Sequence, residues 1–173
     1  MDAPFVYDNP VTGKNFVGRK TECTVLANLL EAGEHVCLYD IPKSGKTSLV
    51  QQTLYNMRAA GKPFMVAYVN AFNVRTSRDF LKKFGGAVLR SAYSTPDDYA
   101  AAIGRHLEGT HFVFDAAMFA SKEDIVCMNW DPDFNDVYRM MQLPQQIARE
   151  KEMPFYVIIK AFQNVMMADS YED

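Results

Sequence analysis

The chain has 173 residues, of which 49% are hydrophobic and 23% are charged, a composition typical of a soluble globular protein and not of a disordered chain. Lys and Arg total 18 against 21 Asp and Glu, which gives a net charge of −3. This balance gives no strong sign of a nucleic-acid binder, because such proteins normally carry a basic face. The length suits one domain with a sizeable core.

Cysteine use and the first residues favour a cytoplasmic protein. Cys23, Cys37 and Cys127 are odd in number, widely spaced and form no CxxC pair, which is typical of a reducing compartment and argues against a disulfide framework or a zinc site. The segment after Met1 has neither a basic n-region nor an apolar h-region, so we expect no signal peptide. No apolar run approaches the ~20 residues that a membrane span needs. We therefore predict a cytoplasmic location without membrane contact.

The first third of the chain predicts a lead-in, two helices and one strand. Residues 1–14 are rich in Pro, Asp, Asn and Gly and predict an extended lead-in. Apolar residues at helical spacing up to Leu30 predict a helix, and Gly33 stands where a glycine would end it. The apolar run 35–39 predicts a buried strand, and a second helix is predicted over 46–60, closed by Gly61 and Pro63.

The remaining two thirds alternate strands with helices. The runs 64–69 and 155–159 are continuously apolar, which suits parallel strands covered on both faces. A shorter strand or buried turn is predicted over 111–114. Further helices are predicted after the cap residues Ser77 and Thr95 and over 133–150, the last with a kink at Pro144. The alternation predicts an α/β fold with a doubly wound, mainly parallel sheet.

One motif points to chemistry. The residues from Ser44 to Thr47 match the second half of the phosphate-loop pattern GxxxxGK[ST]. A glycine at position 45 lets successive backbone N–H groups point at an anion, Lys46 can reach the β- and γ-phosphates, and the Thr47 hydroxyl can ligate Mg²⁺. The predicted nucleotide-binding residues of this loop are Lys43, Ser44, Gly45, Lys46, Thr47 and Ser48, with Thr47 as the metal ligand.

The context of the motif supports this interpretation, although one position departs from the pattern. Two other Gly-Lys pairs, Gly13-Lys14 and Gly61-Lys62, lack the hydroxyl residue that should follow. Only the pair at 45–46 follows a predicted strand and opens a predicted helix, as the motif requires. Asp40 stands where the first glycine belongs. Asp tolerates turn conformations, so the backbone path can survive, but its charge would weaken phosphate binding unless the side chain points away.

With these residues in view, the chain resembles the start of the archaeal-type AAA ATPases, a group of P-loop ATPases related to STAND proteins. The resemblance rests on the segment NFVGRK at 15–20, the predicted helix and strand after it, and PKSGKTSL at 42–49. In that family the first segment precedes the first strand and packs near the adenine. The resemblance therefore implies nucleotide contacts for Phe16, Val17 and Gly18. It also implies ATP and Mg²⁺ as ligands and a three-layer P-loop sandwich around a central, mainly parallel sheet.

The same resemblance implies a defect in catalysis. The segment YVIIKAFQ at 156–163 sits where the family has its Walker B strand, and its last two residues match. Lys160 and Ala161 replace the Asp that coordinates Mg²⁺ and the Glu that activates water. We expect residues 15–173 to form a nucleotide-binding domain without the family's lid and C-terminal domains. ATP hydrolysis should be very slow or absent.

Two other functions stay open at this point. One is a non-catalytic interaction module that keeps the P-loop fold, and the other is a small phosphotransferase. The phosphotransferase is less favoured because compact kinases usually open with the phosphate-loop strand, whereas a predicted helix and the segment 15–19 come first here. Besides the nucleotide, a protein partner or a second copy of the chain is compatible with either of the first two functions.

Acidic and histidine residues elsewhere are interpreted as structural. The segment 131–136 begins like a calcium loop, but an aspartate stands at its sixth position where glycine is required, so we expect a turn and a helix cap. His106 and His111 have the wrong spacing for a shared metal ion. Asp115, after a short apolar run, and Asp169 are the alternative acids for the Walker B role.

Overall fold

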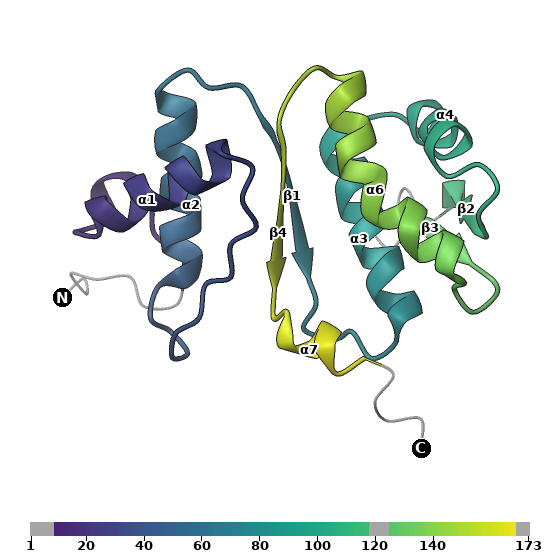
Figure 1. The fold of residues 1–173 in the computed structure, drawn as a ribbon, viewed down its shortest axis with the longest axis horizontal. Coiled ribbons are helices and arrows are strands. Elements are labelled where there is room, and N and C mark those ends of the chain that lie inside the picture. The colour runs from purple at the N-terminus through teal and green to yellow at the C-terminus, as the bar shows by residue number, and fades with distance from the viewer. Residues whose placement is uncertain (1–8, 118–124, 169–173) are drawn as a thin grey trace. The chain divides into compact units, whose positions relative to one another are not determined.

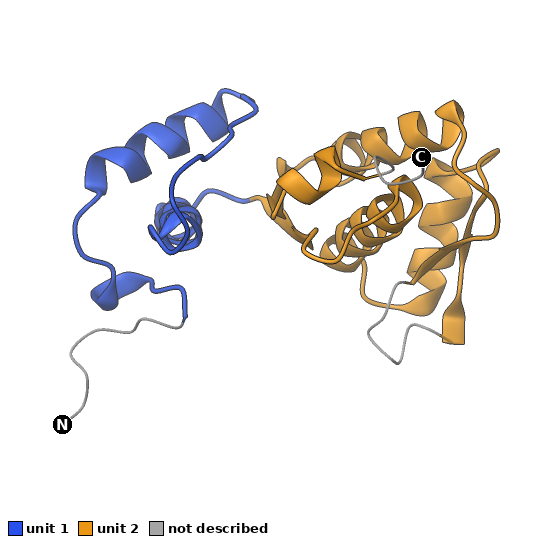
Figure 2. Ribbon diagram, turned by 90° about the horizontal axis from the view of Figure 1, so that it is seen from below, with its two compact units in different colours: residues 1–63 blue, residues 64–173 orange. Residues whose placement is uncertain are grey.

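The computed structural model describes residues 9–117 and 125–168 and divides the chain into two compact units, residues 1–63 and residues 64–173 (Figures 1 and 2). We call them unit 1 and unit 2. Helices and strands both occur, which confirms the prediction of a mixed α/β fold. Each unit has a hydrophobic cluster of its own, so the two are described separately.

Unit 1 consists of helices around a small apolar cluster. A short 3-10 turn, η1 (Gly13–Asn15), precedes α1 (Lys20–Glu31) and α2 (Lys46–Ala59). The two α-helices contact each other. The buried members of the cluster are Cys23, Leu26 and Leu49, and the partly buried residues packed against them are Phe16, Leu30, Leu38 and Val50. This cluster joins the first turn of α2 to α1.

Both helices of unit 1 end as the sequence predicts. Gly33 lies in the left-handed region with φ of 78°. Its N–H donates to the Leu30 carbonyl, and the Glu34 N–H donates to the Leu29 carbonyl, so the last turn of α1 closes as a Schellman motif. Gly61, with φ of 77°, follows the end of α2 in the same way.

The strand predicted at 35–39 is wrong. The structure gives no strand there, Cys37 is exposed, and Tyr39 is 98% exposed. An apolar run becomes a strand only when its N–H and C=O groups find a partner strand, and unit 1 has none among its described residues. The segment is therefore an extended link between α1 and the start of α2.

Unit 2 holds two small sheets (Figure 1). β1 (Met65–Asn70) pairs in parallel with β4 (Phe155–Lys160), as the two long apolar runs predict. β2 (Phe112–Phe114) lies in the strand or buried turn predicted over 111–114 and pairs antiparallel with β3 (Val126–Met128). The sequence analysis missed β3. Among the described residues the parallel sheet has these two strands, so the structure supports a mixed α/β fold but no full three-layer sandwich.

The helices of unit 2 separate its strands along the chain. α3 (Ser77–Ala92) and α4 (Pro96–His106) follow β1, α6 (Phe134–Glu150) precedes β4, and the short α7 (Gln163–Met166) follows it. α6 continues through Pro144, where a kink was predicted. α3 contacts β1 and α6, and α6 also contacts β4. These contacts cover one face of the parallel pair.

Side-chain caps start these helices. The Thr76 hydroxyl accepts a hydrogen bond from the Asp79 N–H, so α3 is capped one residue before the predicted Ser77. Thr95 caps α4 as predicted. Asp133 caps α6 in a reciprocal capping box, which confirms the interpretation of 131–136 as a turn and helix cap.

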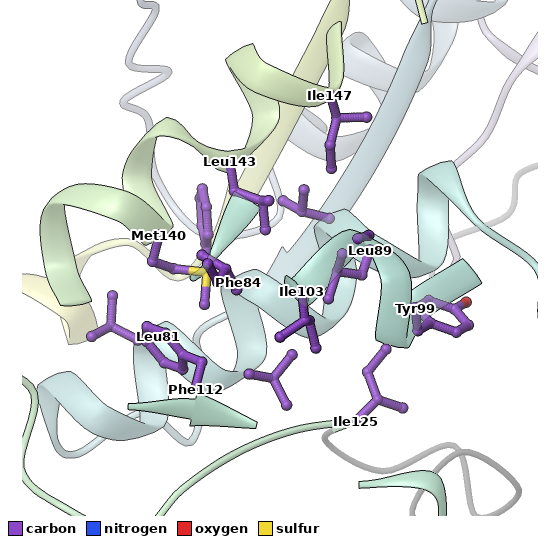
Figure 3. Close-up of a cluster of buried hydrophobic side chains, with 14 of the residues drawn as sticks. Leu81, Phe84, Leu89, Tyr99, Ile103, Phe112, Ile125, Met140, Leu143 and Ile147 are labelled. Atoms are coloured by element: carbon purple, nitrogen blue, oxygen red, sulfur yellow. The ribbon is translucent and has the colours of Figure 1, made fainter. Parts of the chain in front are cut away.

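The core of unit 2 lies between its helices and both sheets. Figure 3 shows Phe84 of α3 close to Met140 and Leu143 of α6, and the two α6 side chains are fully buried. Gly85 explains how closely the helices approach, because a methyl group there would lie 2.7 Å from Met140 Cε. Gly85 therefore serves helix packing.

Candidate functional site

The predicted phosphate loop lies between the extended link and α2 in unit 1. Gly45 is the N-cap of α2 and has a φ of 84°, a conformation that favours glycine. Among the described residues no side chain caps this helix end, and the first intrahelical bond runs from the Leu49 N–H to the Gly45 carbonyl. The amides of the first turn therefore lack acceptors within the helix. Together with the helix dipole they make this end attractive to an anion.

The Lys46 side chain folds back over the loop. Its Nζ donates to the backbone carbonyls of Asp40 and Ile41, both at 2.8 Å, and lies 3.4 Å from Ser44 Oγ. The ammonium group is thus held by neutral oxygens and not by a carboxylate. Its charge is placed within the loop, where the motif requires a cation for phosphate.

A second cation contacts the loop, and sequence reasoning missed this role. Arg19 Nη1 donates to the Ser44 carbonyl at 3.1 Å, and Arg19 Nε donates to Glu22 Oε1 at 3.2 Å. The three-residue spacing between Arg19 and Glu22 is the only sequence signal for their hydrogen bond. The contact between Arg19 and Ser44 joins residues that are 25 positions apart, so no local sequence pattern predicts it.

The Asp40 side chain does not point away from the loop. Its Oδ1 accepts a hydrogen bond from the Ile41 N–H at 2.7 Å. This bond, followed by one from the Ser44 hydroxyl and by the charges of Lys46 and Arg19, holds the pKa of the Asp40 carboxyl below its usual range. The side chain is therefore ionised at neutral pH. The loop therefore carries this anion together with Lys46 and the exposed Lys43, which has a φ of 63°, and Arg19 contacts it from outside.

The other predicted nucleotide-binding residues also lie in unit 1. Phe16 is partly buried against the cluster that contains Leu49, whereas the Val17 side chain is 83% exposed. Gly18 has a φ of 78°, which explains the glycine there. Ser48 Oγ accepts a hydrogen bond from the Val11 N–H at 3.1 Å, so this hydroxyl fastens the lead-in to α2. Contact of these residues with an adenine ring stays a prediction.

The loop fits a magnesium-bound phosphate better than a free metal ion. The chain offers the half-buried Thr47 hydroxyl, whereas the Asp40 carboxylate is already bound to loop donors. Mg²⁺ usually keeps several waters and takes one or two protein oxygens together with substrate phosphates. Thr47 would hold the ion together with a nucleotide, and it offers too few ligands to hold it alone.

The predicted Walker B strand is β4 of unit 2. Lys160 pairs with Asn70 of β1 and is exposed, and its carbonyl accepts a hydrogen bond from the Ala71 N–H. Ala161 follows with a φ of 56°. Asn164 of α7 donates to the carbonyls after β1, which fixes this end of the sheet. The strand thus ends in a cation and a methyl group.

Asp115 does not lie on the parallel pair. It follows β2 of the antiparallel sheet, where its N–H donates to the Ile125 carbonyl and its Oδ1 accepts from the Ala117 N–H. Its second oxygen lies 3.8 Å from Cys127 Sγ. The other alternative acid, Asp169, lies outside the described residues.

A histidine and two acids meet where α6 begins. Fully buried Asp136 accepts from His111 Nδ1 and the His111 N–H, both at 2.8 Å, and from the Asp133 N–H at 2.9 Å. Burial alone would raise the pKa of Asp136, but these hydrogen bonds outweigh it and leave the pKa lowered, while Asp136 raises the pKa of His111. His111, Asp133 and Asp136 lie close enough to face one cation. Because both oxygens of Asp136 are already engaged, we interpret the group as a structural lock.

A second hydrogen-bonded group links α3, α4 and α6 at their C-terminal ends. Glu150 Oε2 lies 2.8 Å from His106 Nε2 and accepts a hydrogen bond from the Tyr93 hydroxyl at 3.1 Å. Burial, and then the Glu150 charge, raise the pKa of Tyr93 to about 12. The sequence separation of 44 and 57 residues explains why both contacts were missed.

Comparisons with known proteins add no relative. No protein-family model, no curated protein and no solved structure matches this chain. Within the part of the chain that the structure describes, no helix is both long and apolar enough to cross a membrane. The loop at 40–48 of unit 1 is therefore the feature from which we infer a function.

Proposed function

We propose that this chain binds ATP with Mg²⁺ through the loop from Asp40 to Ser48. The observation that carries the proposal is the position of Lys46, whose ammonium group folds over a loop that opens an uncapped helix. A cation beside free helix amides is the arrangement that phosphate groups require. Gly45, Lys46 and Thr47 would hold the phosphates and the metal.

The proposal extends to the fold and to the cell. We also propose that residues 15–173, after the lead-in 1–14, form a three-layer P-loop sandwich with a mainly parallel sheet. We further propose a cytoplasmic location. The resemblance to archaeal-type AAA ATPases supports the fold, and the cysteine pattern supports the location. A protein partner or a second copy of the chain would use the nucleotide-bound state as a switch.

Hydrolysis should be very slow or absent. In the resembling ATPases an Asp orients Mg²⁺ and a Glu polarises the attacking water. The corresponding positions at the end of β4 hold Lys160 and Ala161, neither of which can do this. The bound nucleotide would therefore persist, and binding is the activity we propose.

The second candidate is an interaction module that keeps the fold without binding nucleotide. The Asp40 carboxylate within the loop favours it, because a fixed anion opposes phosphate. A small phosphotransferase is the third candidate, and incubation with ATP and candidate acceptors separates it from the other two.

Calorimetric titration with Mg-ATP tests the proposal. We expect binding in the micromolar range, weakened more than tenfold in Lys46→Ala, because this substitution removes the ammonium group that lies against the loop carbonyls of Asp40 and Ile41. The matched control is Lys14→Ala, which removes an exposed lysine that also follows a glycine in unit 1. Absence of heat with the native chain, or equal affinity in Lys46→Ala, would favour the interaction module. Melting curves without ligand should be nearly unchanged in both variants.

A further inference from the structure

Asp40 is the loop residue whose charge opposes the proposed ligand. Its carboxylate accepts the Ile41 N–H at 2.7 Å, and its own carbonyl accepts the Lys46 ammonium at 2.8 Å. The Ser44 hydroxyl also interacts with this carboxylate. One backbone N–H and one hydroxyl group of the loop are thus engaged by an anion that belongs to the chain.

We propose that Asp40 is the residue that sets the nucleotide affinity of this loop, acting as a built-in competitor for phosphate. The inference rests on the proposed function and deepens it. The carboxylate holds donors that a phosphate oxygen would otherwise use, and it offsets part of the positive charge of Lys46 and Arg19. Mg-ATP must displace or tolerate this anion when it binds.

Electrostatics gives the direction of the effect. Like charges a few ångströms apart repel, and the repulsion grows as water is excluded from between them. The loop carries Lys43 and Lys46, and Arg19 contacts it while paired with Glu22, so the Asp40 charge offsets part of this positive charge. Removal of the Asp40 charge should therefore strengthen binding, by about tenfold at the modest screening of an exposed loop.

A purely structural role for Asp40 predicts the opposite sign. If the side chain served only to hold the turn through the Ile41 N–H, its loss would loosen the loop and weaken binding. Backbone strain does not complicate the comparison, because Asp40 is not among the residues with positive φ. Glycine at this position would thus relieve no strain; it removes the side chain and also frees the backbone, an effect that Asp40→Asn does not share.

The experiment compares Asp40→Gly and Asp40→Asn with the native chain by calorimetric titration with Mg-ATP. The asparagine keeps an oxygen for the Ile41 N–H but carries no charge, so it separates charge from turn geometry. Glu34→Gln is the control, since it removes an exposed negative charge of unit 1 six positions before Asp40. We expect about tenfold tighter binding in Asp40→Gly, a smaller gain in Asp40→Asn and no change in Glu34→Gln.

The outcomes separate this inference from the proposed function. If the native chain binds in a Lys46-dependent way and Asp40→Gly binds equally or more weakly, the inference is overturned and the proposed function stands. If the native chain is silent but Asp40→Gly binds, and Asp40→Gly with Lys46→Ala does not, the inference holds in its strongest form. If neither chain binds, both fail.

Discussion

Unit 2 and unit 1 differ most in what they bury. In unit 2, helices and both sheets enclose a large cluster in which residues such as Val88, Leu143 and Ile147 are fully buried. In unit 1, Tyr39, just before the phosphate loop, is 98% exposed, and Ile41, within the loop, is 73% exposed. The apolar side chains of unit 2 are thus explained by burial in its core. Several apolar side chains of unit 1 are not buried within that unit.

The largest expected effect concerns turnover at the end of β4. The native chain should show no steady phosphate release near about 1 s⁻¹, the rate of a working enzyme. If the end of β4 holds the Walker B positions, as the proposed function assumes, Lys160→Asp combined with Ala161→Glu supplies a metal ligand and a general base, and a general base typically contributes about 10²–10⁴-fold. We expect a clear rise in phosphate release that disappears when Lys46→Ala is added. Steady turnover in the native chain that disappears in Lys46→Ala would contradict this prediction and point to another acid, with Asp115 or Asp169 the first to test.

The second prediction compares the two cores. Leu143→Ala should lower the free energy of unfolding by about 3 kcal/mol, because it leaves a cavity in the closely packed core of unit 2. Leu29→Ala, at a position of α1 that is 37% exposed, should cost less than about 1 kcal/mol. Urea unfolding at neutral pH measures both. An equal loss of unfolding free energy in the two variants would show that Leu29 is more deeply buried than its exposed fraction of 37% indicates.

The third prediction concerns pH and the lock at the start of α6. Because Asp136 raises the pKa of His111 above 6.5, its stabilisation is complete below that value and is lost as pH rises through the raised pKa. The lowered pKa of Asp136 gives stability that is present above 3.8 and lost as pH falls through the lowered value. The pair should therefore stabilise most between these limits.

His111→Gln should flatten the stability loss between about pH 6 and pH 8, measured as the urea midpoint. The control is His35→Gln, at an exposed histidine of unit 1. A native chain whose midpoint does not fall over this range would contradict the assigned role of His111.

The smallest predicted effect tests the approach of α3 and α6. Gly85→Ala places a methyl group 2.7 Å from Met140 Cε, so the gain in helix propensity should be cancelled or reversed. Gly86→Ala meets its nearest side-chain atom at 3.8 Å and should stabilise by up to about 1 kcal/mol. Thermal melting of the two variants gives the difference. A more stable Gly85→Ala would mean that the helices can separate at no cost.

Local rules explain what the sequence could predict. The glycine ends of α1 and α2, the Thr95 cap and the two long apolar strands depend on neighbouring residues, and the structure confirms them. The prediction of a strand at 35–39 was wrong because a strand forms only when a second strand, often distant in the sequence, pairs with it. β3 and the Arg19 contact with Ser44 also depend on residues far apart in the chain. For the candidate site, the motif indicates the residues that the proposed function names, but it could not predict the hydrogen bonds that Asp40 and Lys46 make within the loop.

The most direct test of the central claim follows backbone amide signals during titration with Mg-ATP. Nuclear magnetic resonance of the ¹⁵N-labelled chain should show the largest shifts at Gly45, Lys46 and Thr47, the amides that begin α2. Signals of the buried unit 2 residues Leu143 and Ile147 should hardly move. Shifts concentrated in unit 2, or no shifts at the start of α2 at saturating nucleotide, would contradict the assignment of this loop as the nucleotide site.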